Sequence, residues 1–140
     1  MDELKTLIIN KMRTPTVAAL ATITKDGKPW VRYVTPFADN NLTIWCATFA
    51  GTRKTGQIIN SPEIHLTLGV STPENLDYYL QIQGRAEVLT DDASKQAVWG
   101  DHLVPMFTGP DDPNLNVIKI TPYRIEIQEA KPVPPKVWEA

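Results

Sequence analysis

The chain opens with apolar residues at helical spacing, namely Leu4, Leu7, Ile8 and Met12. This spacing predicts an amphipathic helix over residues 2–13, which Pro15 ends. From Thr16 the period changes. Apolar segments rich in β-branched and aromatic residues follow, separated by turn signals such as "KDG" and "ADNN", and they predict strands. They cover residues 16–23, 29–37, 42–49, 63–70 and 76–90.

The fifth of these strands alternates clearly between apolar and polar side chains. One face carries Leu80, Ile82, Ala86 and Val88, and the other Gln81, Gln83, Arg85 and Glu87. Residues 115–130 predict a last strand or a bent pair of strands. Such meanders favour a mainly β fold, a small antiparallel barrel of about six strands with accessory helices, over a doubly wound sheet.

Between the strands, two segments predict helices and two predict loops. The helices cover residues 52–60 and 91–107, the second with Asp91 or Asp92 as its cap and a break near residues 100–105. The loops cover residues 71–75 and 108–114. The proline-rich tail, residues 130–140, is expected to be extended, with Trp138 disordered or docked on a partner subunit.

Composition narrows the class of protein. A chain of 140 residues predicts a single domain, residues 1–140, that builds its own core. A charged content of 21% and a net charge of −2 argue against disorder and against broad nucleic-acid binding. No apolar run approaches the roughly 20 residues of a membrane span. With no basic leader and the single Cys46, we expect a soluble, cytoplasmic protein.

The helix that begins after Gly51 places two cations, Arg53 and Lys54, in its first turn. That end of a helix carries partial positive charge, so two exposed cations there cost roughly 0.3–1 kcal/mol each. The free backbone N–H groups, a Thr52 cap hydroxyl and the two cations together suit a phosphate. Hydrogen bonds to a charged group contribute about 1.5–3 kcal/mol each, which outweighs the cost. Two solvated surface cations are the alternative.

Other conspicuous side chains have structural interpretations. His65 and His102 lack neighbours at metal-ligand spacing, so no metal site is predicted. Cys46 is expected to be a small packed residue, and Asp111 and Asp112 are expected to be turn acids. There is no Gly-rich dinucleotide fingerprint and no Walker loop.

Four stretches follow one another in a characteristic order: "LATITKDGKPWVR" (20–32), "TRK" (52–54), "NSPEI" (60–64) and "IQGRAEV" (82–88). A fifth, "MFTGPDDPNLNVIKITPYRIEI", covers residues 106–127. In this order the sequence resembles the pyridoxamine-phosphate-oxidase-like FMN-binding split barrels, and the last stretch resembles their general stress protein branch. The resemblance covers nearly the whole chain.

The resemblance implies a homodimer with FMN in clefts between the subunits. By position, the phosphate would be held by Arg53 and Lys54, with help from Thr48 and Thr52. The flavin would run past Arg32, Tyr33, Val34 and Thr35, mainly along their backbone, with Tyr79 and Gln81 near the ring. Taken from the residues alone, Arg32 could instead be a solvent-facing side chain and Gln81 part of a solvated face.

The implied function is an FMN-dependent oxidoreductase that acts on an unidentified small substrate and is linked to stress. A flavin-binding or redox-sensing module without turnover, and the same fold with F420 or haem, are the alternatives. Oxidases of the vitamin B6 pathway close with an Arg-Leu-type motif, whereas this chain carries "KPVPPKVWEA", so that activity is not expected. No catalytic acid or base can be assigned, and the chemistry would belong to the cofactor.

Overall fold

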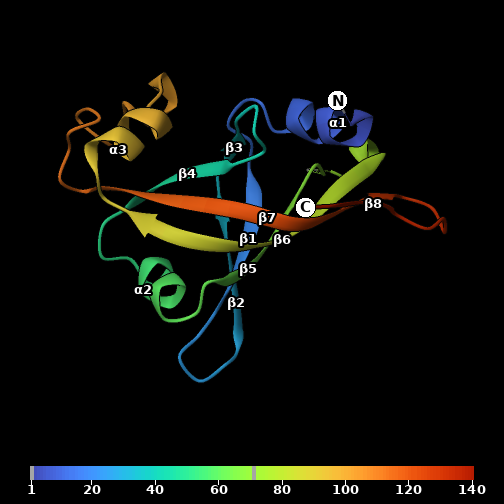
Figure 1. The fold of residues 1–140 in the computed structure, drawn as a ribbon, viewed down its shortest axis with the longest axis horizontal. Coiled ribbons are helices and arrows are strands. Elements are labelled where there is room, and N and C mark those ends of the chain that lie inside the picture. Colours follow the sequence, from blue (N-terminus) through green and yellow to red (C-terminus); the bar gives the residue numbers. More distant parts are fainter. Residues whose placement is uncertain (1, 71) are drawn as a thin grey trace.

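The computed structural model describes residues 2–70 and 72–140, which form one antiparallel sheet with three α-helices around it (Figure 1). The helices are α1 (Glu3–Lys11), α2 (Arg53–Asn60) and α3 (Asp92–Val98). The strands are β1 (Ala18–Ile23), β2 (Pro29–Val34), β3 (Phe37–Ala38), β4 (Ile44–Phe49), β5 (Glu63–Leu68), β6 (Tyr78–Leu89), β7 (Leu115–Glu129) and β8 (Lys136–Glu139). Two short 3₁₀ turns cover Pro73–Asn75 and Asp101–Leu103.

The strand order is β2-β1-β5-β6-β7-β4-β3, and β8 pairs with β7 outside this path. The two end strands, β2 and β3, are separated only by Thr35 and Pro36 in the chain, so the sheet curls back on itself. This mainly antiparallel barrel confirms the predicted fold class. The predicted number of about six strands was too low, because the sheet has eight in the described residues.

Most predicted strands differ from the observed ones by at most two residues at either end, but one of them divides. The segment predicted as one strand over residues 29–37 divides into β2 and β3 at Pro36, which lacks the N–H that a ladder needs. The last strand, left open as one strand or a bent pair, is the single strand β7. Its pairing with β6 shifts register between Gln83 and Gly84 because Tyr123 is bulged out. A Cβ on Gly84 would lie 2.9 Å from the Thr121 carbonyl oxygen, so this close approach requires glycine.

The helices follow the predicted positions more closely than the predicted lengths. Asp2 caps α1 by accepting from the Leu4 N–H, and Asp91 caps α3 by accepting from Ser94. The helix predicted over residues 91–107 ends at Val98, and a 3₁₀ turn and an irregular segment follow. The predicted loop over residues 71–75 lies partly outside the described residues; its part from Pro73 to Asn75 forms a 3₁₀ turn.

The main core fills the barrel interior, and buried residues of β1, β4, β5, β6 and β7 contribute to it together with α1 and α2. As predicted, Leu80, Ile82 and Ala86 are buried, whereas Gln83, Arg85 and Glu87 on the opposite face are exposed. A smaller apolar cluster lies under α3, built around Leu103, Phe107 and Leu115. Strand β4 contributes to both clusters, with Ile44 and Cys46 in the main core and Trp45 and Ala47 packed against the smaller cluster.

The proline-rich tail is neither disordered nor a free arm. Residues 136–139 form β8, which pairs antiparallel with Arg124–Ile127 of β7. The prediction for Trp138 was wrong, because its side chain packs against the main core of its own chain. The sequence of a proline-dominated segment does not predict its pairing with a strand that is distant in the chain. Among the described residues, no helix is long and apolar enough to cross a lipid bilayer.

Candidate functional site

The start of α2 is built as the sequence predicts. Gly51 has φ +75°, a left-handed conformation that glycine adopts without strain, and it turns the chain out of β4. Thr52 is the N-cap, and Arg53 and Lys54 form the first turn. No acidic residue lies in that turn. The free N–H groups of α2 and the two cations therefore lie at the same end of the helix, with no carboxylate of the turn to balance them.

Two hydroxyl groups next to this helix start lack hydrogen-bond partners. The Oγ1 atoms of Thr48 and Thr52 are both inaccessible to solvent and make no hydrogen bond within the described residues. Thr48 is only 4% exposed and lies on the inward face of β4. The predicted cap bond from Thr52 is absent, because its side chain bonds to no backbone N–H. A buried unsatisfied polar group costs about 1–3 kcal/mol, so these two hydroxyls indicate a ligand.

The cations of this region form a group without acidic partners. Every ion pair found between described residues involves other side chains, and none includes Arg32, Arg53 or Lys54. Burial lowers the pKa of Lys54, and the nearby Arg32 lowers it further, although Cys46 acts in the opposite direction. Burial and the charge of Arg53 likewise lower the pKa of Arg32. Three mutually repelling cations therefore stand close together, an arrangement that an anion would relieve.

Arg32 is held inside the barrel rather than exposed on its outer face. Its guanidinium donates to Thr22 Oγ1 at 2.7 Å and to Gln57 Oε1 at 2.9 Å. It also donates to the carbonyl oxygens of Leu20 and Trp30. All these acceptors are neutral, so they fix the side chain in place but leave its positive charge available to the site.

A cavity of about 270 Å³ opens between β2 and β4 beside these groups. Thr48 and Lys54 line it together with Tyr33 and Val34 of β2 and with Thr35, which follows β2. The opposite wall comes from the segment after α3, with Leu103, Met106 and Phe107. The Phe107 ring packs on Phe49 at 4.7 Å between centroids. The sequence does not predict this wall, because nothing in the local pattern of residues 99–107 indicates that this segment folds back over β4.

A tryptophan also contributes to the site. The guanidinium of Arg53 lies 5.4 Å from the centre of the Trp30 ring, which fixes the direction of this exposed side chain. The partner is on β2, so the contact joins the helix start to the edge of the sheet. A Trp preceding a strand arginine gives no sequence signal of this role.

The remaining predicted residues, Tyr79 and Gln81, do not line this cavity. Tyr79 lines a larger cavity of about 860 Å³ on the other side of Tyr33. Gln81 lies in a polar groove on the outer face of β5, β6 and β7 with His65 and Arg124. Within one chain, the structure therefore brings together Tyr33, Val34, Thr35, Thr48 and Lys54 in the cavity, with Arg32, Thr52 and Arg53 beside it.

Other titratable groups near the site have structural roles. Cys46 is buried, and burial raises the pKa of its thiol to about 11, so it stays protonated at neutral pH. Asp112 accepts hydrogen bonds from the Thr108 and Asn114 N–H groups, as expected of a turn acid. No cluster of His, Cys, Asp and Glu suited to a metal ion occurs among the residues the structure describes.

Comparisons with known proteins identify the family of this chain. Residues 2–129 match the family model described as pyridoxamine 5'-phosphate oxidase. The chain therefore belongs to the pyridoxamine 5'-phosphate oxidase-like family, which confirms the resemblance seen in its motifs. It is 34% identical to General stress protein 26 of Bacillus subtilis (strain 168) over 129 residues, which cover 92% of this chain and 91% of that protein.

Solved structures show the same fold. General Stress Protein 26 from Bacillus anthracis str. Sterne superposes with a TM-score of 0.82 at 25% identity, over 99% of this chain and all of that one. A heme binding protein from Mycobacterium smegmatis superposes with a TM-score of 0.72 at 17% identity, over 90% of this chain and 53% of that one. The second likeness concerns the fold alone.

Proposed function

We propose that the protein binds FMN, with the flavin phosphate at the start of α2. The observation that carries this proposal is the buried, unpartnered Thr48 hydroxyl beside two cations that have no acidic partner among the described residues. A phosphate supplies acceptors for the free N–H groups, for both hydroxyls and for Arg53 and Lys54 at once. The donor set therefore fits a phosphate ester.

The strand β2 would carry the rest of the cofactor. It is an end strand of the sheet path, so its outer edge keeps backbone groups that no neighbouring strand pairs. Tyr33, Val34 and Thr35 line the cavity next to this edge. We therefore assign the ribityl chain and the edge of the ring to these backbone groups, while Arg32 contributes its charge from within the barrel. A bound flavin supplies hydride or single-electron transfer at its ring.

We further propose that the active form is a homodimer. Tyr33 is 80% exposed, Val31 62% and Val17 62%, which gives an apolar area beside the cavity. Exposed apolar residues that gather beside a ligand site are typical of an interface. Tyr79 and Gln81 face away from the phosphate cavity of their own chain, and in a dimer they would reach the flavin of the other copy.

The proposed activity is that of an FMN-dependent oxidoreductase acting on a small substrate, with a link to stress suggested by the General stress protein 26 relatives. A flavin-binding module without turnover remains the alternative within the same site. Reduction of the bound flavin by NADH or NADPH distinguishes the two: a rate no faster than that of free FMN would rule out the enzyme.

The experiment that tests cofactor binding is an absorption spectrum of the purified protein before and after addition of FMN and desalting. Flavin bands that stay with the protein at one FMN per chain are the expected result. A Soret band in the purified protein, or loss of all FMN on desalting, would contradict the proposal. Gel filtration coupled to light scattering gives the mass, and a monomer of 15.7 kDa would rule out the dimer.

A further inference from the structure

A second and larger cavity adjoins the phosphate cavity. It has a volume of about 860 Å³, against about 270 Å³ for the cavity at Thr48 and Lys54. The two cavities share Val17 and Tyr33 as lining residues. A molecule in the larger cavity would therefore contact the same part of β2 that the proposed flavin follows.

The walls of this larger cavity are mostly apolar and aromatic. Leu68, Val70 and Leu76 contribute aliphatic surface, and Tyr33 and Tyr79 contribute rings. Its polar groups include the side chains of Thr16 and Thr67. Such a cavity, apolar with few polar groups, is typical of sites for small organic molecules. The two rings favour a flat ligand, because aromatic faces and edges contact one another well.

Lys11 is the single charged side chain among the described residues that line this cavity, and it is held in place. Its Nζ lies 4.1 Å from the centre of the Tyr78 ring. Its Cε lies 3.2 Å from the position that a Cβ on Gly69 would occupy. Gly69 has φ +117°, which a residue with a side chain rarely adopts, so the chain there leaves space for the lysine stem.

The ammonium group of Lys11 has no carboxylate partner among the described residues. The contact with Tyr78 occupies one side of the group and leaves N–H donors for another partner. An anionic group on a ligand would complete the set.

We propose that this Lys11 cavity is the substrate pocket of the flavin site and that it takes a planar, apolar carboxylate whose acidic group binds Lys11. This inference rests on the proposed FMN site, because the shared wall at Val17 and Tyr33 is what brings such a ligand next to the flavin. Lys11 is then a binding residue that selects anionic substrates, and the tyrosines select flat ones.

The test uses the FMN-loaded protein and two probes of the same shape, 2-naphthoate and its neutral amide. Calorimetry gives the affinities, and the flavin absorption bands report contact with the ring. We expect naphthoate to bind about 10- to 100-fold more tightly than the amide, as one charge-assisted hydrogen bond would give, and to shift the flavin bands. Lys11→Met keeps the aliphatic stem and should abolish the difference, whereas Lys11→Arg should keep most of it.

The matched control is Lys25→Met, which removes an exposed cation from the turn between β1 and β2 and should leave both affinities unchanged. Equal affinity for the two probes, or an unchanged preference in Lys11→Met, would overturn the inference. So would failure of both probes to bind a dimer that holds FMN, because a second copy would then fill the cavity. Loss of FMN on desalting would instead contradict the proposed function, so the two failures are distinguishable.

Discussion

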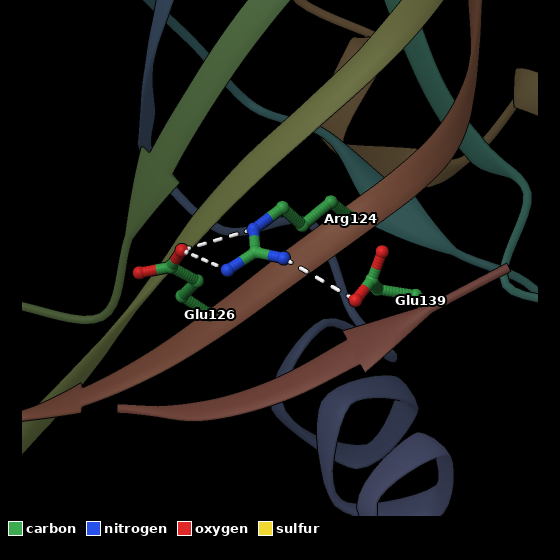
Figure 2. A network of polar contacts seen from close by, with 3 residues as sticks. All are labelled: Arg124, Glu126 and Glu139. Atoms are coloured by element: carbon green, nitrogen blue, oxygen red, sulfur yellow. Dashed lines mark hydrogen bonds and ion pairs between the residues drawn. The ribbon is translucent and has the colours of Figure 1, made fainter. Parts of the chain in front are cut away.

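Two groups of charged side chains, one on β7 and one at the start of α2, each contain an arginine and differ in how their charges are balanced. On β7, Arg124 donates to Glu126 at 2.8 Å and pairs with Glu139 of β8 at 3.3 Å (Figure 2). At the start of α2, Arg53 and Lys54 have no carboxylate partner among the described residues. The first group fastens the C-terminal strand to the sheet, so its charges are satisfied within the chain. In the proposed function, the second is satisfied by the FMN phosphate.

The two groups also differ in the side chains that surround them. Around Arg124 the acceptors are carboxylates, and the pairs remain partly exposed. Around Lys54 the neighbours are another cation, a buried thiol and a buried hydroxyl without a partner. A stable protein tolerates such an arrangement when binding, rather than folding, is what selects it. Changes in the α2 group should therefore alter FMN affinity, and changes in the β7–β8 group should alter stability.

The largest expected effect is on FMN binding in the double variant Arg53→Ala with Lys54→Ala. Two charge-assisted hydrogen bonds contribute together about 3–6 kcal/mol, which corresponds to a loss of about 10²- to 10⁴-fold in affinity. The melting temperature of the flavin-free protein should not fall, because the removed cations oppose the helix dipole. Fluorescence titration with FMN measures the affinity, with Arg85→Ala, which removes an exposed cation paired with Glu63, as the matched control. Unchanged affinity in the double variant would place the phosphate elsewhere.

The next largest effect is expected on stability, in the β7–β8 region. Trp138→Ala should lower the free energy of unfolding by about 1–3 kcal/mol, less than the 3–5 kcal/mol typical of fully buried rings, because this side chain is only partly buried. FMN affinity should stay the same. Urea unfolding measures the free energy of unfolding, and Val137→Ala on the opposite face of β8 is the control. A stability equal to that of wild type would mean that β8 contributes nothing to the fold.

These two regions also differ in how far the sequence predicts them. The placement of Arg53 and Lys54 follows from local signals, since a glycine, a cap residue and helical spacing lie next to them in the chain. The inward direction of Arg32 does not follow from the residues alone, because strand alternation groups Arg32 with Val34 but leaves open which face is buried. The position of β8 depends on its pairing with Arg124–Ile127, and the proline-rich sequence of the tail does not predict this pairing.

The same limit applies inside the site. The alternation of β4 predicts that Thr48 shares a face with Cys46. It does not predict that the Thr48 hydroxyl lacks a partner, because this depends on how α2 and β2 pack against β4. Likewise, Met106 and Phe107 form a wall only because the segment after α3 folds over β4. Local patterns predict which elements form and which face is buried. They do not predict which elements meet, and cavities arise where elements meet.

Smaller changes are expected for Thr48→Val, which keeps the shape of the side chain and removes its hydroxyl: stability should rise and FMN affinity should fall. The flavin-free protein should gain about 1 kcal/mol of stability, because an unsatisfied buried hydroxyl is removed. FMN should bind about 5- to 15-fold less tightly, through loss of one hydrogen bond of about 1–1.5 kcal/mol. Thr121→Val, at an exposed position of β7, is the control. A loss of stability without FMN would show that the hydroxyl has a partner within the fold.

The smallest effect is expected for Glu139→Gln, which removes one exposed carboxylate from Arg124 and leaves Glu126 in place. Exposed ion pairs contribute about 0–1 kcal/mol and weaken with salt. The loss in unfolding free energy should therefore stay below about 1 kcal/mol in dilute buffer and vanish in about 1 M salt. Glu129→Gln, which removes the partner of Lys131 in an exposed pair, should behave in the same way. If Glu139→Gln instead weakened FMN binding, the two groups would be coupled through β7, and the division between a binding region and a folding region would not hold.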